Sequence, residues 1–531
     1  MFAVNTASAG GQPNKYFVLF IVSLGTVLSG YVSSSLDIAL SNIMNTFGFT
    51  MDTVTWVLLS YMIPYGATLP IMGKLGDQFG HKRMYVGGLI LFTVATMMVG
   101  LSWSSASVVI FRILQGIGAA MFFPNAMTIV ANAFPPNERG QAMGMWGALA
   151  ASGAALGPTI GGYIVEYLNW RMLFNSIVPI AAVGIILAIT VLKESELNNT
   201  SAKIDYFGGL MLVSSLSSLI IILNRGSKEG WTSLYIVSLF IIMFLSMAVF
   251  VYVESHSKDP LVDISLFKNS TFVAANVVGF LTFMALMGGL FLIPFFLRNI
   301  LGYTPIHAGI ALIPLIVSMI FLAPLGGKLA DRAGGKTPTM LGMLILSVSL
   351  YSFHTMTADT SYPFIAVRLV FMGIGLALTM SPLSNAAMAT LPKEKTGVGS
   401  GVFNLFKNVG GSVGIAILGT LLDQRQIYHT QILSNYIDVS SSIAQQTVAG
   451  IQAVFMQSGM QSSQAYAAAL SVLQGMVTKQ AAVMAYSDLF KIAALLASLG
   501  IIASTMIRNI PKNNETSEIE GEKEPVPAAI H

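Results

Sequence analysis

Charged side chains inside long apolar runs are the residues of this sequence that could do chemistry. Asp37 is the only acidic residue well inside the first thirteen apolar runs, and Arg112 lies inside the fourth. A charge at the centre of a bilayer costs at least about 2.5 kcal/mol, so both residues are functional candidates. A desolvated carboxyl that gains and loses a proton suits proton transfer, and Asp37 could also attract a cationic ligand. We predict that Asp37 carries a proton and that Arg112 needs an anion; a helix-end Asp37 and an Arg112 that anchors carbonyl groups are the alternatives.

A glycine-rich stretch, residues 73–83, could form a mobile contact between helices. Its glycines allow a tight turn and close helix packing, and Asp77 is suited to capping a helix end or to pairing with Arg83 or Arg139. The pattern recurs in shortened form at residues 327–336, which favours a gate over a basic loop that only sets topology. The predicted gate residues are Gly73, Asp77, Gly80, Lys82, Arg83 and Asp331.

A second glycine motif follows in the fifth apolar run. Gly153, Gly157 and Gly161 are four residues apart, so they lie on one face of a helix and allow close packing against a neighbour. Pro158 can bend such a helix in lipid, because neighbouring helices re-satisfy the freed carbonyl group. Gly162 adjoins the same face, and the residues by themselves predict close helix packing.

Polar and aromatic side chains in otherwise apolar helices are candidates for a substrate cavity. Aromatic faces and adaptable Met side chains suit bulky lipophilic ligands, although each such residue alone is more often a packing residue. The candidates are Tyr31, Tyr61, Gln115, Asn125, Asn385, Asn404 and Asn408.

Composition defines the environment of all these residues. The 531-residue chain has 54% hydrophobic and only 9% charged residues, with a mean hydropathy of +0.73, which excludes an ordinary soluble protein. Zero cysteines exclude disulfides, thiolate-bound zinc, iron–sulfur clusters and a thiol nucleophile. The phosphate-cradling pattern G-x-x-x-x-G-K-[ST] does not occur, which argues against an ATP-driven pump. We expect no catalytic site, no cofactor, no metal and no nucleic-acid partner.

Fourteen mostly apolar runs have about the 20 residues that a helix needs to cross a bilayer. Seventeen Lys and Arg residues fall on the side that holds the termini and six on the other, so both termini are expected in the cytoplasm. The predicted fold class is an all-α polytopic membrane protein with 14 transmembrane helices. The runs are 15–38, 52–73, 84–102, 106–130, 139–165, 172–192, 204–224, 232–253, 270–297, 304–327, 337–356, 361–390, 397–422 and 487–508.

The chain also contains an internal repeat. Gly73 recurs as Gly327 at an offset of 254, and Arg112 recurs as Arg368 at an offset of 256. Parallel repeats of this kind build transporters that rock two halves around a central site, so we predict two pseudo-symmetric six-helix bundles with two inserted linker helices. The predicted divisions are a cytoplasmic tail at 1–14, an N-terminal bundle at 15–192, a linker with the inserted helices at 193–268, a C-terminal bundle at 269–508 and a cytoplasmic tail at 509–531.

The segment 423–485 within the second bundle is too polar to span a membrane. Its apolar residues recur at helical spacing around 444–482, which predicts two amphipathic helices with a turn near 458–460. Such a hairpin would project outwards, either to contact a partner or as a lid over the exit. The tail at 509–531 is rich in Glu and Pro and is predicted to be disordered.

These motifs resemble those of the major facilitator superfamily. The stretch 73–83 is similar to its loop signature, residues 112–116 resemble its fourth-helix motif, and residues 153–162 resemble the fifth-helix motif of its drug:proton antiporters. The fourth-helix resemblance implies that Arg112 lies beside the first helix and forms a proton-coupling pair with Asp37. The fifth-helix resemblance implies that Gly153, Gly157, Pro158, Gly161 and Gly162 form a packing hinge, with simple helix packing as the alternative. Fourteen spans and the outer segment 423–485 resemble the EmrB-like branch of multidrug exporters. The resemblance covers residues 15–508.

The resemblance implies proton-coupled antiport that exports amphipathic or lipophilic drugs or toxic compounds across the bacterial inner membrane by alternating access. It implies lipid, protons and small amphipathic substrates as partners, together with a periplasmic adaptor protein and an outer-membrane channel. The chain departs from the pattern at Ala39, at Thr46 and at His81, where a basic Arg is common. Transport of one physiological metabolite or fatty acid and, from another class, a non-transporting receptor are the alternatives.

Overall fold

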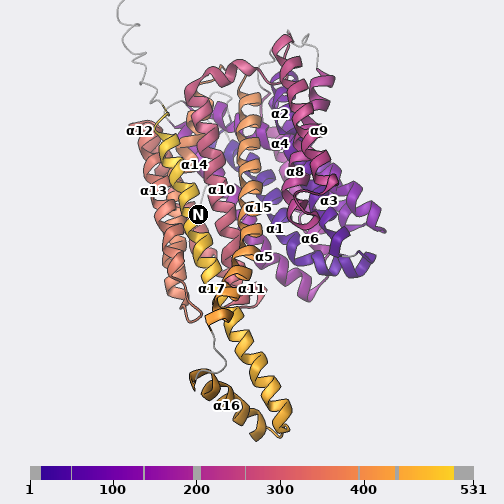
Figure 1. Cartoon of the computed structure of the whole chain (residues 1–531). Coiled ribbons are helices and arrows are strands. Elements are labelled where there is room, and N and C mark those ends of the chain that lie inside the picture. Colours follow the sequence, from indigo (N-terminus) through magenta and orange to yellow (C-terminus); the bar gives the residue numbers. More distant parts are fainter. Residues whose placement is uncertain are drawn as a thin grey trace, which may run out of the picture.

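The computed structural model describes residues 13–49, 51–135, 138–194, 205–257, 259–392, 395–436 and 442–507, and the regular elements within them are all helices (Figure 1). The predicted all-α polytopic fold is confirmed. The first bundle comprises α1 (Lys15–Phe47), α2 (Met51–Phe79), α3 (His81–Gly100), α4 (Ser105–Ala133), α5 (Arg139–Tyr167), α6 (Met172–Asn175) and α7 (Val178–Val191). The linker holds α8 (Tyr206–Glu229), α9 (Leu234–His256) and η1 (Ile264–Lys268). The second bundle comprises α10 (Ser270–Asn299), α11 (Pro305–Ile310), α12 (Ile313–Ala333), α13 (Lys336–Ser352), η2 (Phe353–Thr355), α14 (Tyr362–Ala389), α15 (Thr396–Tyr436), α16 (Ser442–Gln457) and α17 (Ser462–Ser504).

The number of membrane spans is close to the predicted one. Thirteen helical stretches of the described chain are long and apolar enough to cross a bilayer. The one predicted run without a counterpart among these stretches is 337–356. It corresponds to α13, which has 17 residues, a length of about 25 Å at 1.5 Å per residue. A hydrocarbon core is about 30 Å thick, so α13 is short for a span and the count of fourteen stays a prediction.

Close helix pairs build each bundle in the same way. In the first bundle α1 packs on α5 and α2 on α4; in the second, α10 packs on α15 and α12 on α14. The glycine motif of α5 explains the first pair: a Cβ at Gly153 would overlap the carbonyl oxygen of Val27, and a Cβ at Gly157 would overlap the hydroxyl of Ser34 on α1. Backbones this close exclude larger side chains, so the motif fixes the distance between α1 and α5.

The inserted pair α8–α9 covers a seam between the two bundles. Leu212 of α8 is buried in one apolar cluster with Ala67 of α2 and Val398 of α15, so this helix contacts both halves. The segment after α9 joins the same cluster through Val262 and Leu266, which are 6% exposed. The linker therefore packs as a third element against α2 and α15.

An ion pair between Asp263 and Lys395 ties the linker to the start of α15. Burial alone would raise the pKa of Asp263, but hydrogen bonds from Lys395 and Ser265 outweigh it and lower the pKa to about 2. A carboxyl with a lowered pKa stabilises the fold above its ordinary pKa of about 4. This contribution is lost only as the pH falls towards 2.

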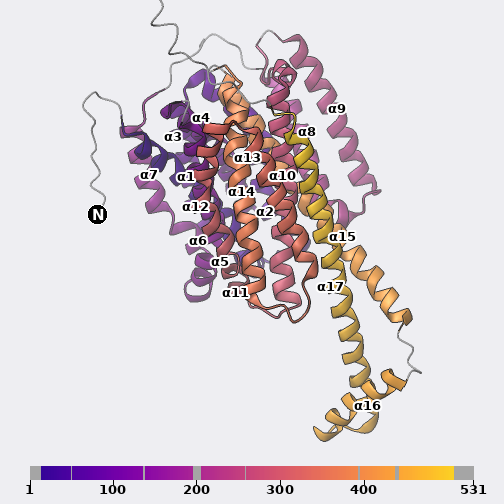
Figure 2. The ribbon, with the colours of Figure 1, turned by 90° about the vertical axis from the view of Figure 1, so that its left-hand side faces the viewer.

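An arm projects from one end of the molecule (Figure 2). The helices that contain the predicted runs 397–422 and 487–508 are longer than those runs, because α15 continues to Tyr436 and α17 begins at Ser462. The turn expected near 458–460 lies between α16 and α17, where Gly459 has a φ of +90°. We call the end that bears the arm the arm end, and the opposite end, where α2 and α12 finish, the motif end.

The predicted tails lie almost wholly outside the described residues. Of residues 1–14 only Pro13 and Asn14 are described, and Asn14 caps α1 through a hydrogen bond of 2.9 Å from the backbone N–H of Tyr16. Residues 509–531 fall entirely outside the described chain.

The packing of α1 on α5 gives a matched test of the glycine motif. Gly153→Val should lower the unfolding temperature in detergent by several degrees, because overpacking a tight contact costs about 1–3 kcal/mol. Gly147→Val on the same helix is the control, since a Cβ there meets nothing within 4 Å. Equal unfolding temperatures for the two variants would contradict the role given to Gly153.

Candidate functional site

The carboxylate of Asp77 caps a helix of the opposite bundle. Asp77 lies near the end of α2 and is 7% exposed. It accepts hydrogen bonds of 2.9 Å from the backbone N–H groups of Gly397 and Val398. These residues form the first turn of α15, whose N–H groups have no partner within the helix. A carboxylate there satisfies two donors and interacts favourably with the positive end of the helix dipole.

The second copy of the motif makes the mirror-image contact. Asp331, near the end of α12, accepts hydrogen bonds from the backbone N–H groups of Gly140 at 3.0 Å and Gln141 at 3.2 Å, in the first turn of α5. The side-chain amide of Asn385 lies 3.4 Å from Asp331, so this residue, predicted for the cavity, belongs to the motif end. Each bundle therefore supplies one carboxylate that caps a helix of the other. We call these two contacts the reciprocal caps.

Glycine is required on both sides of the reciprocal caps. A Cβ at Gly73 would overlap the carbonyl oxygen of Gly397, and a Cβ at Gly327 would overlap that of Gly140. The helices α2 and α15, like α12 and α5, thus touch through their backbones. This close approach brings each carboxylate within reach of its helix terminus.

The basic residues of the motif contact the carboxylate of Glu194 and not that of Asp77. The carboxylate of Glu194, which follows α7, accepts hydrogen bonds from the backbone N–H groups of Lys82 at 3.0 Å and Arg83 at 3.2 Å. The side chain of Arg83 lies 3.6 Å from the same carboxylate, and Lys82 donates to the carbonyl group of Ile189. Gly80, with a φ of +102°, makes the turn between α2 and α3. Of the two roles predicted for Asp77, the structure thus shows capping.

His81, which the sequence indicated only as a departure from the family pattern, contacts the predicted gate residue Asp77. It is 5% exposed, and its ring lies between Asn125 and Asp77, with Nδ1 2.7 Å from Asn125 Oδ1 and Nε2 3.4 Å from Asp77 Oδ1. The amide nitrogen of Asn125 donates to the carbonyl groups of Met72 and Met121, so its oxygen is left to accept from Nδ1. Asn125, which we predicted for the cavity, therefore lies at the motif end beside His81.

A polar network surrounds Arg112 in the interior of the first bundle. Arg112 is 1% exposed, donates to the carbonyl oxygen of Val57 at 3.1 Å and to the side chain of Gln115 at 2.6 Å, and lies 4.5 Å from the ring centroid of Tyr61. Gln115 in turn donates to Thr96 at 2.6 Å. Gln115 and Tyr61, predicted for the cavity, thus orient the guanidinium group. The predicted alternative for Arg112, anchoring of a carbonyl group, is one of its contacts.

Five other predicted residues lie on α1 and α5, and two of their side chains are outside the described ones. Asp37 is on α1, but its side chain is not among those described, so its pairing with Arg112 stays a prediction. The side chain of Pro158 is likewise not described. Tyr31 is 6% exposed, and its backbone carbonyl lies against Gly157 of α5. Gly161 packs on Ser35 in the same interface, and Gly162 is buried.

The remaining candidates lie on α15 where the two bundles meet. Asn404 is 1% exposed; its oxygen accepts from Lys407 at 3.2 Å and its amide lies 3.7 Å from the sulfur of Met127 on α4. Asn408 lies beside the hydroxyl of Tyr65 on α2. Both asparagines therefore contact the first bundle, as a central site would require.

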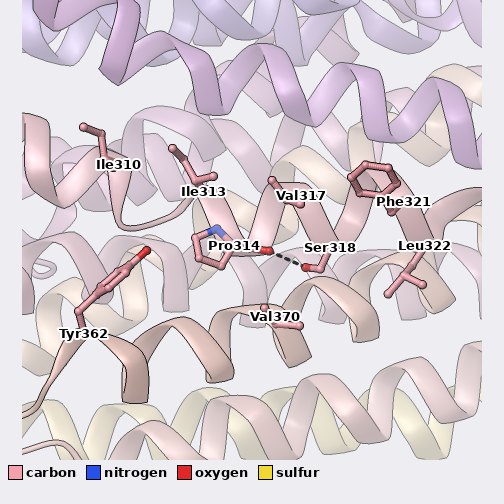
Figure 3. Close-up of a pocket in the computed structure, with 9 residues that line it drawn as sticks. All are labelled: Ile310, Ile313, Pro314, Val317, Ser318, Phe321, Leu322, Tyr362 and Val370. Atoms are coloured by element: carbon pink, nitrogen blue, oxygen red, sulfur yellow. Dashed lines mark hydrogen bonds between the residues drawn. The ribbon is translucent and has the colours of Figure 1, made fainter.

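Two pockets have defined walls, and the predicted cavity residues line neither. One of about 550 Å³ lies between α12 and α14 and is almost entirely apolar (Figure 3). Its serine, Ser318, donates to the carbonyl group of Pro314 at 2.8 Å, which leaves the hydroxyl of Tyr362 as the available polar group. The other, of about 230 Å³, lies at the motif end between Lys74, Asp263 and Lys395. The apolar pocket suits hydrocarbon and has no group that could carry a proton.

These features define a class of protein. Two repeated helical bundles that meet around a polar interior, and that hold each other at one end by the reciprocal caps, are the architecture of a transporter whose halves rock against each other. The chain belongs to the Major Facilitator Superfamily, whose sequence model matches residues 22–415. Among the described residues, no group of three His, Asp or Glu side chains is arranged to hold a metal ion.

Known proteins similar to this chain are transporters. The tetracenomycin C resistance and export protein of Streptomyces glaucescens is 30% identical over 79% of this chain and 78% of its own length. The multidrug transporter protein MdtP of Bacillus subtilis is 27% identical over 98% of both chains. The crystal structure of the human organic anion transporter MFSD10 matches with a TM-score of 0.60 and 16% identity, over 92% of this chain and all of that one, and shows the shared fold.

Removing one reciprocal cap should open the motif end more often. Asp77→Ala should raise the rate at which a cysteine at buried Val398 reacts with a water-soluble maleimide by about fivefold, since losing a helix cap to Ala costs about 1 kcal/mol. The chain has no native cysteine, so the single thiol reports alone. A cysteine at Leu418, buried deeper in α15, is the control and should stay protected. An unchanged rate at position 398 would contradict the capping role of Asp77.

Proposed function

We propose that this chain is a proton-coupled antiporter that exports amphipathic or lipophilic drugs or toxic compounds by alternating access. The observation that carries the proposal is the pair of reciprocal caps, because contacts between the halves at one end must break and reform when access alternates. The multidrug and resistance names of similar proteins support the substrate class. Within the superfamily, we assign the chain to the 14-span, EmrB-like branch.

The proton enters this proposal through Asp37. In the proposal, the guanidinium of Arg112, fixed by Gln115 and Tyr61, attracts the Asp37 carboxylate when it is ionised and releases it when it is protonated. Each proton that moves down 100 mV supplies about 2.3 kcal/mol. The two caps contribute about 1 kcal/mol each, and their sum is close to the energy that one proton supplies. One proton per cycle is therefore enough to open the motif end.

The proposed location is the bacterial inner membrane with both termini in the cytoplasm, so that the motif end faces the cytoplasm. The arm then faces outwards, and we propose that it contacts a periplasmic adaptor protein of a tripartite system with an outer-membrane channel. Support comes from the length of the arm, since α15 runs 14 residues beyond Leu422 and α16 lies wholly outside the bundle. The driving force is the proton gradient, and no cofactor takes part.

Transport by purified protein in liposomes tests the proposal. An imposed pH gradient should drive ethidium accumulation with a matching proton flux, and Asp37→Asn should abolish the pH-driven component while downhill movement continues. Asp359→Asn is the matched control, because Asp359 is an exposed acid in the connection before α14. No substrate-linked proton flux across a broad panel of amphipathic compounds would contradict antiport.

A further inference from the structure

Lys407 is an interior cation that neither the gate nor the Arg112 network uses. It lies on α15, ten residues beyond Gly397, which places it about 15 Å from the motif end at 1.5 Å per residue. Its ammonium group donates to Asn404 at 3.2 Å and lies 4.9 Å from the ring centroid of Phe283 and 5.2 Å from that of Phe403. Within the described part of the chain, no carboxylate forms an ion pair with it.

The contacts of Lys407 leave its charge uncompensated. An amide oxygen and two ring faces stabilise an ammonium group, but a cation at membrane depth is normally paired with an anion or faces water. The residue as a whole is partly buried, whereas neighbouring Phe403 and Asn404 are buried. The described chain therefore holds a positive charge without an ion-pair partner near the meeting point of its two halves.

Aromatic rings of the first bundle continue from this position. Tyr65, whose hydroxyl lies beside Asn408, stacks on Tyr61 with centroids 5.7 Å apart and meets Phe123 edge-on at 6.0 Å. Phe123 in turn meets Trp146 at 5.3 Å. Such a row offers flat apolar surfaces to an aromatic ligand.

The indole N–H of Trp146 is a buried polar group that lacks a hydrogen-bond acceptor in the described part of the chain. Its side chain is 3% exposed, and its indole N–H has no hydrogen-bond partner. An unsatisfied buried donor costs about 1–3 kcal/mol, so it is typical of a place where a ligand atom binds. The row of rings from Tyr65 through Phe123 thus ends at a donor without a partner among the described residues.

We propose that Lys407 binds the anionic group of an aromatic substrate, a carboxylate, sulfonate or phenolate, while Phe283 and Tyr65 contact its rings. This inference deepens the transport proposal on which it rests, because it names a substrate class. The Trp146 indole donates to a second acceptor atom on the same molecule. Lys407 as a purely structural anchor between α10 and α15 is the competing explanation, and the test separates the two.

The test measures binding in detergent without any gradient. The probes are 1-hydroxy-2-naphthoate and its uncharged methyl ester, followed by their fluorescence anisotropy with purified protein. Wild-type protein should bind the anion at least about tenfold more tightly than Lys407→Met does, because a hydrogen bond to a charged group is worth about 1.5–3 kcal/mol. Affinity for the ester should stay within about twofold. Lys407→Arg should retain most of the affinity for the anion.

Controls make each outcome decisive. Lys479→Met, which removes an exposed lysine of the arm, should leave both affinities unchanged. Equal loss of both probes in Lys407→Met would show a structural anchor and overturn the proposal, as would an unchanged affinity for the anion. If Lys407→Met does not fold, the wild-type protein alone decides, since equal affinity for anion and ester also overturns it. Selective binding of the anion without pH-driven transport would contradict antiport but not the anion-binding site at Lys407.

Discussion

The arrangement of the two halves depends on one interaction, a carboxylate at the N-terminus of a helix that belongs to the other half. Asp77 satisfies two backbone N–H groups of α15, and Asp331 does the same for α5. Neither contact is possible unless the helices touch, and they touch because glycines stand where any side chain would overlap a carbonyl group. Charge, helix dipole and glycine spacing therefore act together at one end of the molecule.

The strength of this interaction suits a structure that must open. A helix cap contributes about 1 kcal/mol, and a proton crossing 100 mV releases about 2.3 kcal/mol. A gate with many buried ion pairs would be harder to open on that scale, whereas two caps give a closed end that remains reversible. The buried His81, held between Asn125 and Asp77, adds a third polar contact to one cap, whereas the amide of Asn385 adds one to the other, so the two caps are not equivalent.

Composition and repeats predicted much of the fold, because apolar length and glycine spacing are local properties. The limits of α15 and α17 could not be predicted from hydropathy, since both helices continue into polar sequence. The gate motifs were found because they occur twice. The contacts of Asn125 and Asn385 were missed, since a polar residue in an apolar helix looks the same whether it meets a substrate or another helix. The chemistry of Lys407 could not be predicted from the sequence, because it depends on its spatial neighbours, two aromatic rings and one amide.

The distance between the halves at the motif end tests the reciprocal caps most directly. Spin labels on cysteines placed at Tyr16 and Thr337, which lie at the starts of α1 and α13, report it by pulsed electron resonance. The account predicts one short distance in the wild-type protein and a second, longer population in Asp77→Ala and in Asp331→Ala, with the two free-energy changes adding in the double variant. A single unchanged distance in all four proteins would contradict it.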